Sequence, residues 1–262
     1  MRSGTGRPIA RHIVPRSVAK GSRQTVRRRL DARVEQDYVG EVRIAADKLY
    51  GVNSLRGFDN LSVSPLSIAH YPAFRDAFAQ CKWAAALANH ECGVIAQDQA
   101  DAIAQACQAV MAGACDDSLI VDLLEGSGGT STNMNFNEVI ANRAQQFLGH
   151  APGSYEVVHP NDHVNISQST NDVYPAALKI ATHAMLAGLI EQVRLLAQVF
   201  DAKALQFADI LHLGRTCLQD AQPMRLGQLF GGYAALTHRL AEELVAVREK
   251  LHTLPLGGTA IG

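Results

Sequence analysis

The sequence predicts an all-α fold, mixed but mainly helical, on three observations. Apolar residues recur every three or four positions in several separate stretches, which is typical of amphipathic helices. The longest stretch, from Val173 to about Leu211, is apolar on most faces, as expected for a helix in the middle of a bundle. Hydrophobic residues make up 47% of the 262 residues, which is enough for a large buried core.

The stretch before Pro72 lacks this periodicity. Residues 33–64 mix short apolar runs with Gly40, Gly51 and Gly57. Glycine weakens helices and favours turns. We therefore expect irregular structure or brief strands here, and no long helix before the proline.

The first two helices are predicted for residues 73–92 and 98–112, where the apolar spacing is helical and alanine is abundant. Gly93 and Gly113 follow these stretches and are expected to end them. The next apolar run, residues 119–124, is too short to distinguish a strand from a helix.

A glycine-rich polar segment, residues 126–135, is predicted to be a loop, followed by a helix from about Asn137 to Leu148. Backbone N–H groups in such a loop can hold an anion, and a flexible turn without a ligand is the alternative. Nucleotide binding is not supported, because no Lys-Ser or Lys-Thr pair follows and the spacing is not Gly-x-Gly-x-x-Gly.

The segment from residue 159 to residue 177 is rich in hydroxyls and amides and runs directly into the longest helix. Asp172 or Asn171 fits the N-cap, and Pro175 would then lie in the first turn, where proline is tolerated. A helix N-terminus offers free N–H groups and partial positive charge. The segment is therefore expected to bind an anion such as a carboxylate, with a capped loop without ligand as the alternative.

A second polar turn is predicted at residues 214–223, before another helix from Leu226 to about Leu251. Three polar segments thus lie at helix boundaries, namely residues 130–135, 167–172 and 215–219. If these segments converge, they form a site for a small substrate with several carboxylates.

The net charge of −1 conceals a basic N-terminal arm. Residues 1–32 hold nine Lys and Arg against one Asp, a net charge of +8, so the rest of the chain carries −9. We predict a disordered basic leader at 1–32, because it has few large apolar residues and scattered Gly, Ser and Pro. An organelle transit peptide or a nucleic-acid-binding tail is the alternative. The acidic body gives no reason to expect a nucleic-acid partner.

The chain has five cysteines and no Cys-x-x-Cys pair: Cys81, Cys92, Cys107, Cys115 and Cys217. Without a secretory signal, reduced thiols in the cytoplasm are expected, mostly as small core residues. No membrane partner is expected either, because Lys179, His183, Glu191 and Arg194 interrupt the longest helix too often for a membrane span.

Three long motifs occur in order along the chain. They are Gly-Gly-Thr-Ser-Thr-Asn-Met-Asn-Phe-Asn-Glu-Val-Ile-Ala-Asn-Arg-Ala (128–144), His-Pro-Asn-Asp-His-Val-Asn-x-Ser-Gln-Ser-Thr-Asn-Asp-x-Tyr-Pro (159–175) and Gly-Arg-Thr-x-Leu-Gln-Asp-Ala-x-Pro-Met-x-Leu-Gly-Gln (214–228). These motifs closely resemble the aspartase/fumarase superfamily. The resemblance runs from about Arg33 to the last residue. It implies an N-terminal lyase domain at 33–170 and part of a central helical-bundle domain at 171–262, truncated before the rest of the bundle and the C-terminal domain.

The resemblance also implies a homotetramer in which each active site is assembled from loops of three subunits. In the implied reaction, a base removes a proton beside a carboxylate, and ammonia or water leaves by anti elimination. The intermediate is a doubly charged aci-carboxylate, which needs preorganised hydrogen-bond donors.

By this resemblance, the substrate's carboxylates or amino group would be held by Thr130, Ser169, Thr170, Asn171 and Thr216. Ser131 and Asn133 would support the first loop. A secondary anion site, as in fumarases, would involve His159, Asn161 and Asp162, with a purely structural loop as the alternative. No metal ligand and no cofactor are predicted.

The motif details favour the aspartase branch over the fumarase branch. Ser-Thr-Asn-Asp (169–172) and Thr-Ser-Thr-Asn (130–133) are similar to aspartases, where fumarases usually have Ser-Ser-Asn-Asp and Thr-Gln-Ser-Asn. The expected reaction is reversible elimination of ammonia from L-aspartate to give fumarate, with fumarate hydration as the alternative. Cys217 occupies a substrate-binding position where aspartases carry Gln or His, and a thiol is a poor donor.

The family's third motif, a Gly-Ser-Ser-x-Met-Pro-x-Lys-x-Asn-Pro loop with the serine base and a carboxylate-binding lysine, does not occur in these 262 residues. We therefore expect these residues alone to be inactive and to expose apolar helix faces meant for partners. A non-catalytic helical oligomerisation module, or the remnant of a lyase gene, is the alternative. Cys217, and Glu125 where relatives often have Gln, favour that alternative.

Overall fold

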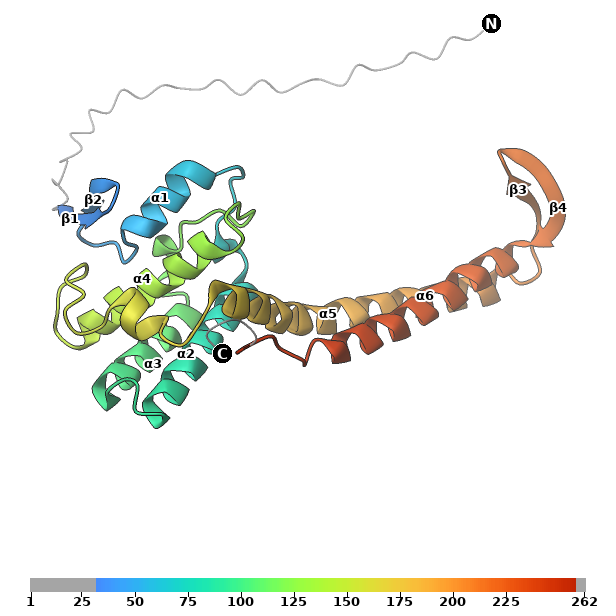
Figure 1. The fold of residues 1–262 in the computed structure, drawn as a ribbon. Coiled ribbons are helices and arrows are strands. Elements are labelled where there is room, and N and C mark those ends of the chain that lie inside the picture. The colour runs from blue at the N-terminus through green and yellow to red at the C-terminus, as the bar shows by residue number, and fades with distance from the viewer. Residues whose placement is uncertain (1–31, 258–262) are drawn as a thin grey trace, which may run out of the picture. The chain divides into compact units, whose positions relative to one another are not determined.

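The computed structural model describes residues 32–257 and is mainly helical, as predicted (Figure 1). The predicted leader lies outside the described residues except for its last residue, and so does the end of the chain from residue 258. The predicted domains at 33–170 and 171–262 stay predictions.

The described part begins with an antiparallel hairpin of β1 (Ala32–Asp37) and β2 (Gly40–Ala45). These are the brief strands that the sequence predicts. They are followed by α1 (Val52–Leu61), a helix of 10 residues that was not predicted. Its N-cap, Gly51, has no side chain to cap the helix. The N–H groups of Gly51, Asn53 and Ser54 donate instead to Glu138, a residue more than 80 positions away, and the N–H of Val52 donates to Glu35. A helix start stabilised by so distant a carboxylate leaves no local signal.

The next two helices are confirmed within one residue at each end. They are α2 (Pro72–Glu91) and α3 (Gln97–Met111). The glycines that follow them, Gly93 and Gly113, have φ of +73° and +78°, a left-handed conformation that favours glycine.

The apolar run at 119–124 forms neither a helix nor a regular strand. It pairs with residues 66–68, where Ile68 N donates to Val121 O and Leu123 N donates to Leu66 O. The apolar side chains of Leu119 and Val121 are buried here, which explains the run without a regular element.

The helix α4 (Thr130–Phe147) begins seven residues earlier than predicted. The segment 130–135, predicted as a loop, is therefore the start of this helix. Helical spacing of apolar residues is missing here because the polar side chains are themselves buried: Asn135 Nδ2 donates to Ser54 Oγ and to Ser118 O.

The longest helix, α5 (Thr170–Gln206), also begins earlier than predicted and ends five residues sooner. Its N-cap is Ser169, whose hydroxyl accepts from Asn171 N, and neither Asp172 nor Asn171 holds that position. Pro175 consequently lies inside the helix rather than in its first turn. The last helix, α6 (Leu226–Lys250), ends one residue before the predicted boundary.

The polar turn predicted at 214–223 is instead a second antiparallel hairpin, formed by β3 (Leu211–Thr216) and β4 (Gln219–Arg225). Cys217 and Leu218 make its two-residue turn, with φ of +48° and +61°. Positive φ at both positions matches the right-handed twist of a tight hairpin. The hairpin joins α5 to α6, which run side by side (Figure 1).

The hydrophobic core lies among α2, α3, α4 and the first turns of α5. Phe78 and Phe136 stack at 4.3 Å between ring centroids, and Tyr174 of α5 meets Phe74 edge-on at 5.6 Å. By length and composition alone, α5 is long and apolar enough to cross a membrane. This is weak evidence for a membrane span, because a core helix of a soluble protein passes the same test.

Candidate functional site

Two helix N-termini meet where the first two polar segments come together. Asn133, in the first turns of α4, donates from Nδ2 to Thr170 Oγ1 at 3.1 Å, and Thr170 is the first residue of α5. A helix N-terminus carries partial positive charge, and α4 and α5 both begin here. Asn133 is buried, whereas Thr170 is partly exposed. The arrangement suits an anion held by hydroxyls and amides.

The α5 side of this site is set by its cap. Because Ser169 Oγ accepts from Asn171 N, the hydroxyl hydrogen of Ser169 is left to donate to a ligand. Thr170 Oγ1 likewise accepts from Asn133 and keeps its own hydrogen. Asn171 is exposed, and Asp172 is buried one residue further into the helix.

The α4 side is shaped by the loop 125–129. The Glu125 carboxylate accepts from the backbone N–H groups of Ser127 and Gly129 and closes the loop on itself. Ser131 N donates to Ser127 Oγ at 2.9 Å, which joins the start of the helix to this loop. The predicted role of the Ser131 side chain stays a prediction. Thr130, the first residue of the helix, is exposed.

Gly129 admits no side chain. Its φ is +94°, and a Cβ built on it would lie 2.7 Å from Cγ of Tyr174. Gly128 has a similar φ of +69° but open space around it. The close approach of Gly129 to Tyr174 brings the start of α4 against the first turns of α5.

The two neighbouring glycines, Gly128 and Gly129, allow a prediction and its matched control. We expect Gly129→Ala to lower the free energy of unfolding by about 2–4 kcal/mol, since the backbone strain of about 1–3 kcal/mol is joined by a clash with the tyrosine ring. Gly128→Ala introduces the backbone strain alone. Its loss of unfolding free energy should therefore be smaller than that of Gly129→Ala, by about 1 kcal/mol or more. Urea denaturation of both variants measures the difference, and equal losses would contradict the role of the contact with Tyr174.

The third polar segment is not brought to the other two within one chain. Thr216 and Cys217 are exposed at the hairpin β3–β4, which follows the C-terminal end of α5. Ser169 and Thr170 lie at the other end of this helix of 37 residues, which is about 55 Å long at 1.5 Å per residue. A single chain therefore assembles two of the three segments.

The predicted secondary anion residues lie on a short π-helical turn, Pro160–Val164, and just before it. His159 Nδ1 accepts from Asn161 N at 3.3 Å and from Asp162 N at 3.2 Å, and it lies 3.2 Å from a side-chain oxygen of Asp162. His159 and Asn161 line a cleft of about 470 Å³ together with Glu35, Asp37 and Glu138. Those three carboxyl groups act against an anion in the cleft, and the role of a secondary anion site stays a prediction.

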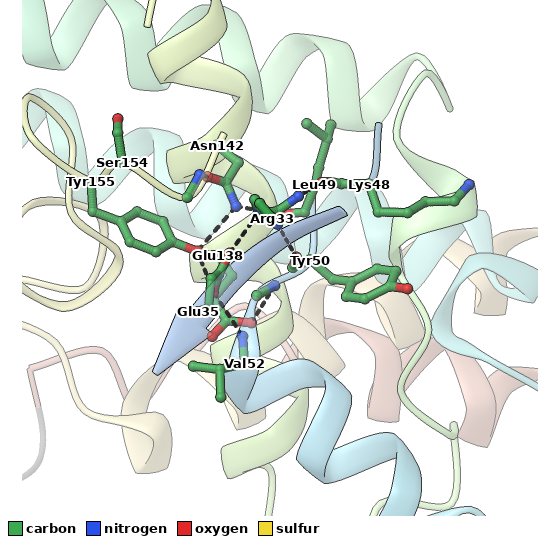
Figure 2. Close-up of polar contacts among 12 residues, drawn as sticks. Arg33, Glu35, Lys48, Leu49, Tyr50, Val52, Glu138, Asn142, Ser154 and Tyr155 are labelled. Atoms are coloured by element: carbon green, nitrogen blue, oxygen red, sulfur yellow. Dashed lines mark hydrogen bonds and ion pairs between the residues drawn. The ribbon is translucent and has the colours of Figure 1, made fainter. Parts of the chain in front are cut away.

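A buried polar cluster joins β1 to α4 beside this cleft (Figure 2). Arg33 is bound to the Glu35 carboxylate at 2.8 Å and donates to the carbonyl oxygens of Lys48 and Tyr50. Glu35 Oε2 accepts from Val52 N at 3.0 Å. The Tyr155 hydroxyl lies 3.3 Å from Glu35 and accepts from Asn142 Nδ2, and burial raises its pKa. These contacts fix α1 and the hairpin β1–β2 against α4.

The structure adds a residue to the site that sequence reasoning missed. Lys82, on α2, is fully buried and donates to Asn165 Oδ1 at 2.8 Å and to Gln168 Oε1 at 3.0 Å. Asn165 Oδ1 also accepts from Asn133 Nδ2, so the lysine is two hydrogen bonds away from a predicted site residue. On the sequence, Lys82 is one polar residue on an amphipathic helix, and nothing local indicates that it points inward.

No group of three or more His, Cys, Asp or Glu side chains able to hold a metal ion occurs within residues 32–257. All five cysteines are free thiols; three are buried, and Cys92 and Cys217 are exposed.

The family model described as lyase matches residues 40–262 of this chain. Among curated relatives, the aspartate ammonia-lyase of Helicobacter pylori (strain J99) is 46% identical over 230 residues, which are 88% of this chain and 49% of the relative. The aspartate ammonia-lyase of Escherichia coli (strain K12) is 42% identical over 231 residues, with 88% and 48% covered. The chain thus spans about half the length of the curated relatives it matches.

Solved structures give the same picture. A Brucella melitensis structure described as fumarate lyase:delta crystallin matches with a TM-score of 0.80 and 40% identity, covering 88% of this chain and 54% of that one. A class II fumarase from Schistosoma mansoni matches with a TM-score of 0.76 and 30% identity, covering 88% and 49%. The polar motifs, the helical fold and these matches agree, and the chain belongs to the aspartase/fumarase family of lyases.

Proposed function

We propose that this chain forms the substrate-binding part of an ammonia-lyase that eliminates ammonia from L-aspartate to give fumarate. The observation that carries the proposal is the hydrogen bond between Asn133 and Thr170, which joins two polar helix N-termini of the family's motifs into one site. The identity of 42–46% to aspartate ammonia-lyases, against 30% to a class II fumarase, supports aspartate over malate as the substrate.

The site's groups suit the charges of this reaction. The hydroxyls of Thr130, Ser169 and Thr170 and the amide of Asn171 can donate to the substrate's carboxylates. As the proton beside one carboxylate leaves, that group gains a second negative charge, and fixed donors at two helix ends stabilise it. Donors held in place before the reaction cost no reorganisation when this charge develops.

We further propose that other copies of the chain complete the site, as a homotetramer. Large apolar side chains on α5 and α6 are about half exposed, including Met185 at 55%, Leu189 at 50% and Val247 at 48%. Such faces are typical of helices that pack against further helices. A neighbouring α5 that runs in the opposite direction would bring its hairpin, with Thr216 and Cys217, to Thr170 of this chain.

The serine-bearing motif that would supply the base in this reaction does not occur in these 262 residues. We expect the 262 residues alone to bind dicarboxylates but to release no fumarate. Co-expression with the C-terminal half of the Helicobacter pylori aspartate ammonia-lyase supplies a serine loop, and the mixed assembly should then form fumarate from L-aspartate. Fumarate is followed by its ultraviolet absorbance.

The role of the site is tested with Thr170→Val in the same assembly. This variant keeps the shape of the side chain and removes the hydroxyl. Activity should fall about 100-fold or more, as for the loss of one donor to a developing oxyanion. Fumarate formation from L-malate instead of L-aspartate would favour the hydratase alternative. Activity with neither substrate would favour the non-catalytic oligomerisation remnant.

Cys217 gives a separate prediction within that assembly. A thiol donates weakly, so a side chain with an N–H group at the hairpin turn should hold a substrate carboxylate better. We expect Cys217→Gln or Cys217→His to raise kcat/KM for aspartate by about tenfold, the value of one hydrogen bond to a charged group. Leu218→Gln, at the adjacent turn position, is the matched control, and an unchanged or lower rate in both Cys217 variants would contradict the prediction.

A further inference from the structure

Lys82 is a buried cation among neutral partners that the chemistry described above does not use. It projects from the middle of α2, has no exposed surface, and its two hydrogen bonds go to the amide oxygens of Asn165 and Gln168. These two residues belong to the segment before α5, where Ser167 adopts a left-handed φ of +58° and Gln168 is buried. The segment that carries the candidate site is therefore folded around the ammonium group.

Starting at Lys82, each hydrogen bond sets the donor and the acceptor of the next one. An ammonium group can only donate, so Asn165 must turn its oxygen toward Lys82. The same oxygen accepts from Asn133 Nδ2 at 3.0 Å, which fixes the orientation of the Asn133 amide. Asn133 Nδ2 then also donates to Thr170 Oγ1, so the Thr170 hydroxyl acts as an acceptor within the protein. Its own hydrogen is left to donate outward.

The orientation of the Asn133 side-chain amide is determined by its neighbours. Its Oδ1 is buried and has no hydrogen-bond partner among residues 32–257. If the amide were turned over, this oxygen could accept from the Thr170 hydroxyl, but Nδ2 would then no longer meet the Asn165 oxygen. A buried acceptor without a partner costs free energy, so a stronger demand holds the amide in place. That demand traces back to Lys82.

We propose that Lys82 is a positioning residue that keeps the Thr170 hydroxyl as a donor to a carboxylate of the substrate, acting through Asn165 and Asn133. The role deepens the proposed function and rests on it for the identity of the ligand. Lys82 does not touch the ligand in this scheme. It sets the direction of the hydrogen bonds in the wall of the site.

The surroundings of Lys82 also favour a change of charge near neutral pH. Burial lowers the pKa of Lys82 to about 7. The thiols of Cys81 on α2 and Cys107 on α3 lie near it, and burial raises the pKa of both, so they are neutral there. The Phe78 ring lies 5.9 Å from Nζ, and among the acidic residues of α5, the helix that packs against α2, Asp172 is the one that is buried. A neutral amine can accept as well as donate, so the order of hydrogen bonds is enforced only below this pKa.

The test uses the intact chain, its Lys82→Met variant and Lys250→Met as a control that removes an exposed lysine. Affinity for succinate, a dicarboxylate that does not react, is measured by calorimetry between pH 6 and pH 8.5. We expect the affinity of the unaltered chain and of Lys250→Met to fall by about tenfold over this range. Lys82→Met should bind at least tenfold more weakly at pH 6 and show no such dependence. An equal pH dependence in Lys82→Met would overturn the proposal.

The same samples carry a second readout that needs no ligand. The NMR signals of the Asn133 side-chain amide are assigned by their loss in Asn133→Asp. They should differ between the unaltered chain and Lys82→Met. In Asn165→Asp, the pH midpoint at which these signals shift should rise, because the new carboxylate lies beside the ammonium group of Lys82. If the unaltered chain binds no succinate, the proposed function fails while these signals still decide the role of Lys82. Signals identical with and without Lys82 would overturn it.

Discussion

Replacing Glu138 with glutamine is expected to lower the free energy of unfolding by about 3–5 kcal/mol. The carboxylate is buried in α4 and accepts five hydrogen bonds, from the N–H groups of Gly51, Asn53 and Ser54 and from the side chains of Asn53 and Ser54. Glutamine has almost the same shape, but its NH₂ group would face donors. Two or more buried donors then lose their acceptor, at about 1–3 kcal/mol each.

The measurement is urea denaturation at neutral pH, with Glu243→Gln on α6 as the matched control. Glu243 is exposed, and its one ion pair within residues 32–257 is a surface contact of 3.7 Å with Arg239. Its replacement should therefore change the free energy of unfolding by less than about 0.5 kcal/mol. Hydrogen exchange adds a local test, because the amides of Gly51, Asn53 and Ser54 should lose protection first. A loss below about 1 kcal/mol for Glu138→Gln would show that the carboxylate does not anchor α1.

The contacts of Glu138 also illustrate which parts of the fold could be predicted from the sequence and which could not. The helices α2, α3 and α6 were predicted within one residue at either end, because their apolar periodicity and end signals lie within the helix. The helix α1 has no side-chain cap from its N-cap residue, and the N–H groups at its start donate to Glu138 and, for Val52, to Glu35. A contact across more than 80 residues cannot be read from a local pattern.

The early start of α4 has a similar cause. Residues 130–137 alternate hydroxyls, amides and a few apolar side chains, a composition typical of a loop. In the structure Thr132, Asn133, Asn135 and Asn137 are all buried, and Asn133 and Asn135 bind side chains from other segments. Polar residues therefore form the inner face of this helix. Tertiary hydrogen bonds, and not apolar burial alone, decide where it begins.

For the candidate site, the sequence predicted the segments but not what supports them. The residues Asn133, Ser169 and Thr170 were named from motifs, and the structure brings them together. The hairpin with Thr216 and Cys217 lies at the other end of α5, which agrees with the implied assembly from several subunits but does not test it. Lys82 was missed because the orientation of one lysine on an amphipathic helix depends on what packs against the helix.

The second large effect expected is on the pH dependence of stability, through Lys82. Its pKa is about 7 in the folded chain and 10.5 ordinarily. Below pH 7 the lysine is protonated in both states, and the folded state bears the full cost of the buried charge. Between pH 7 and pH 10.5 the unfolded chain keeps the proton and the folded chain has lost it. Stability must therefore rise with pH in this window, by roughly 1.4 kcal/mol per pH unit at most.

Lys82→Met removes this dependence, so the informative quantity is the difference in unfolding free energy between the unaltered chain and the variant. From pH 7 to pH 9 the difference should move by about 2–3 kcal/mol in favour of the unaltered chain. Titrations that Lys82 does not influence occur in both proteins and cancel, whereas those of Cys81 and Cys107 shift slightly because the charge of Lys82 lowers the pKa of both thiols. Urea denaturation at pH 6, 7, 8 and 9 gives the curve. A difference that stays constant would mean that Lys82 keeps its proton on folding, and the buried amides of Asn165 and Gln168 would then suffice to hold a full charge.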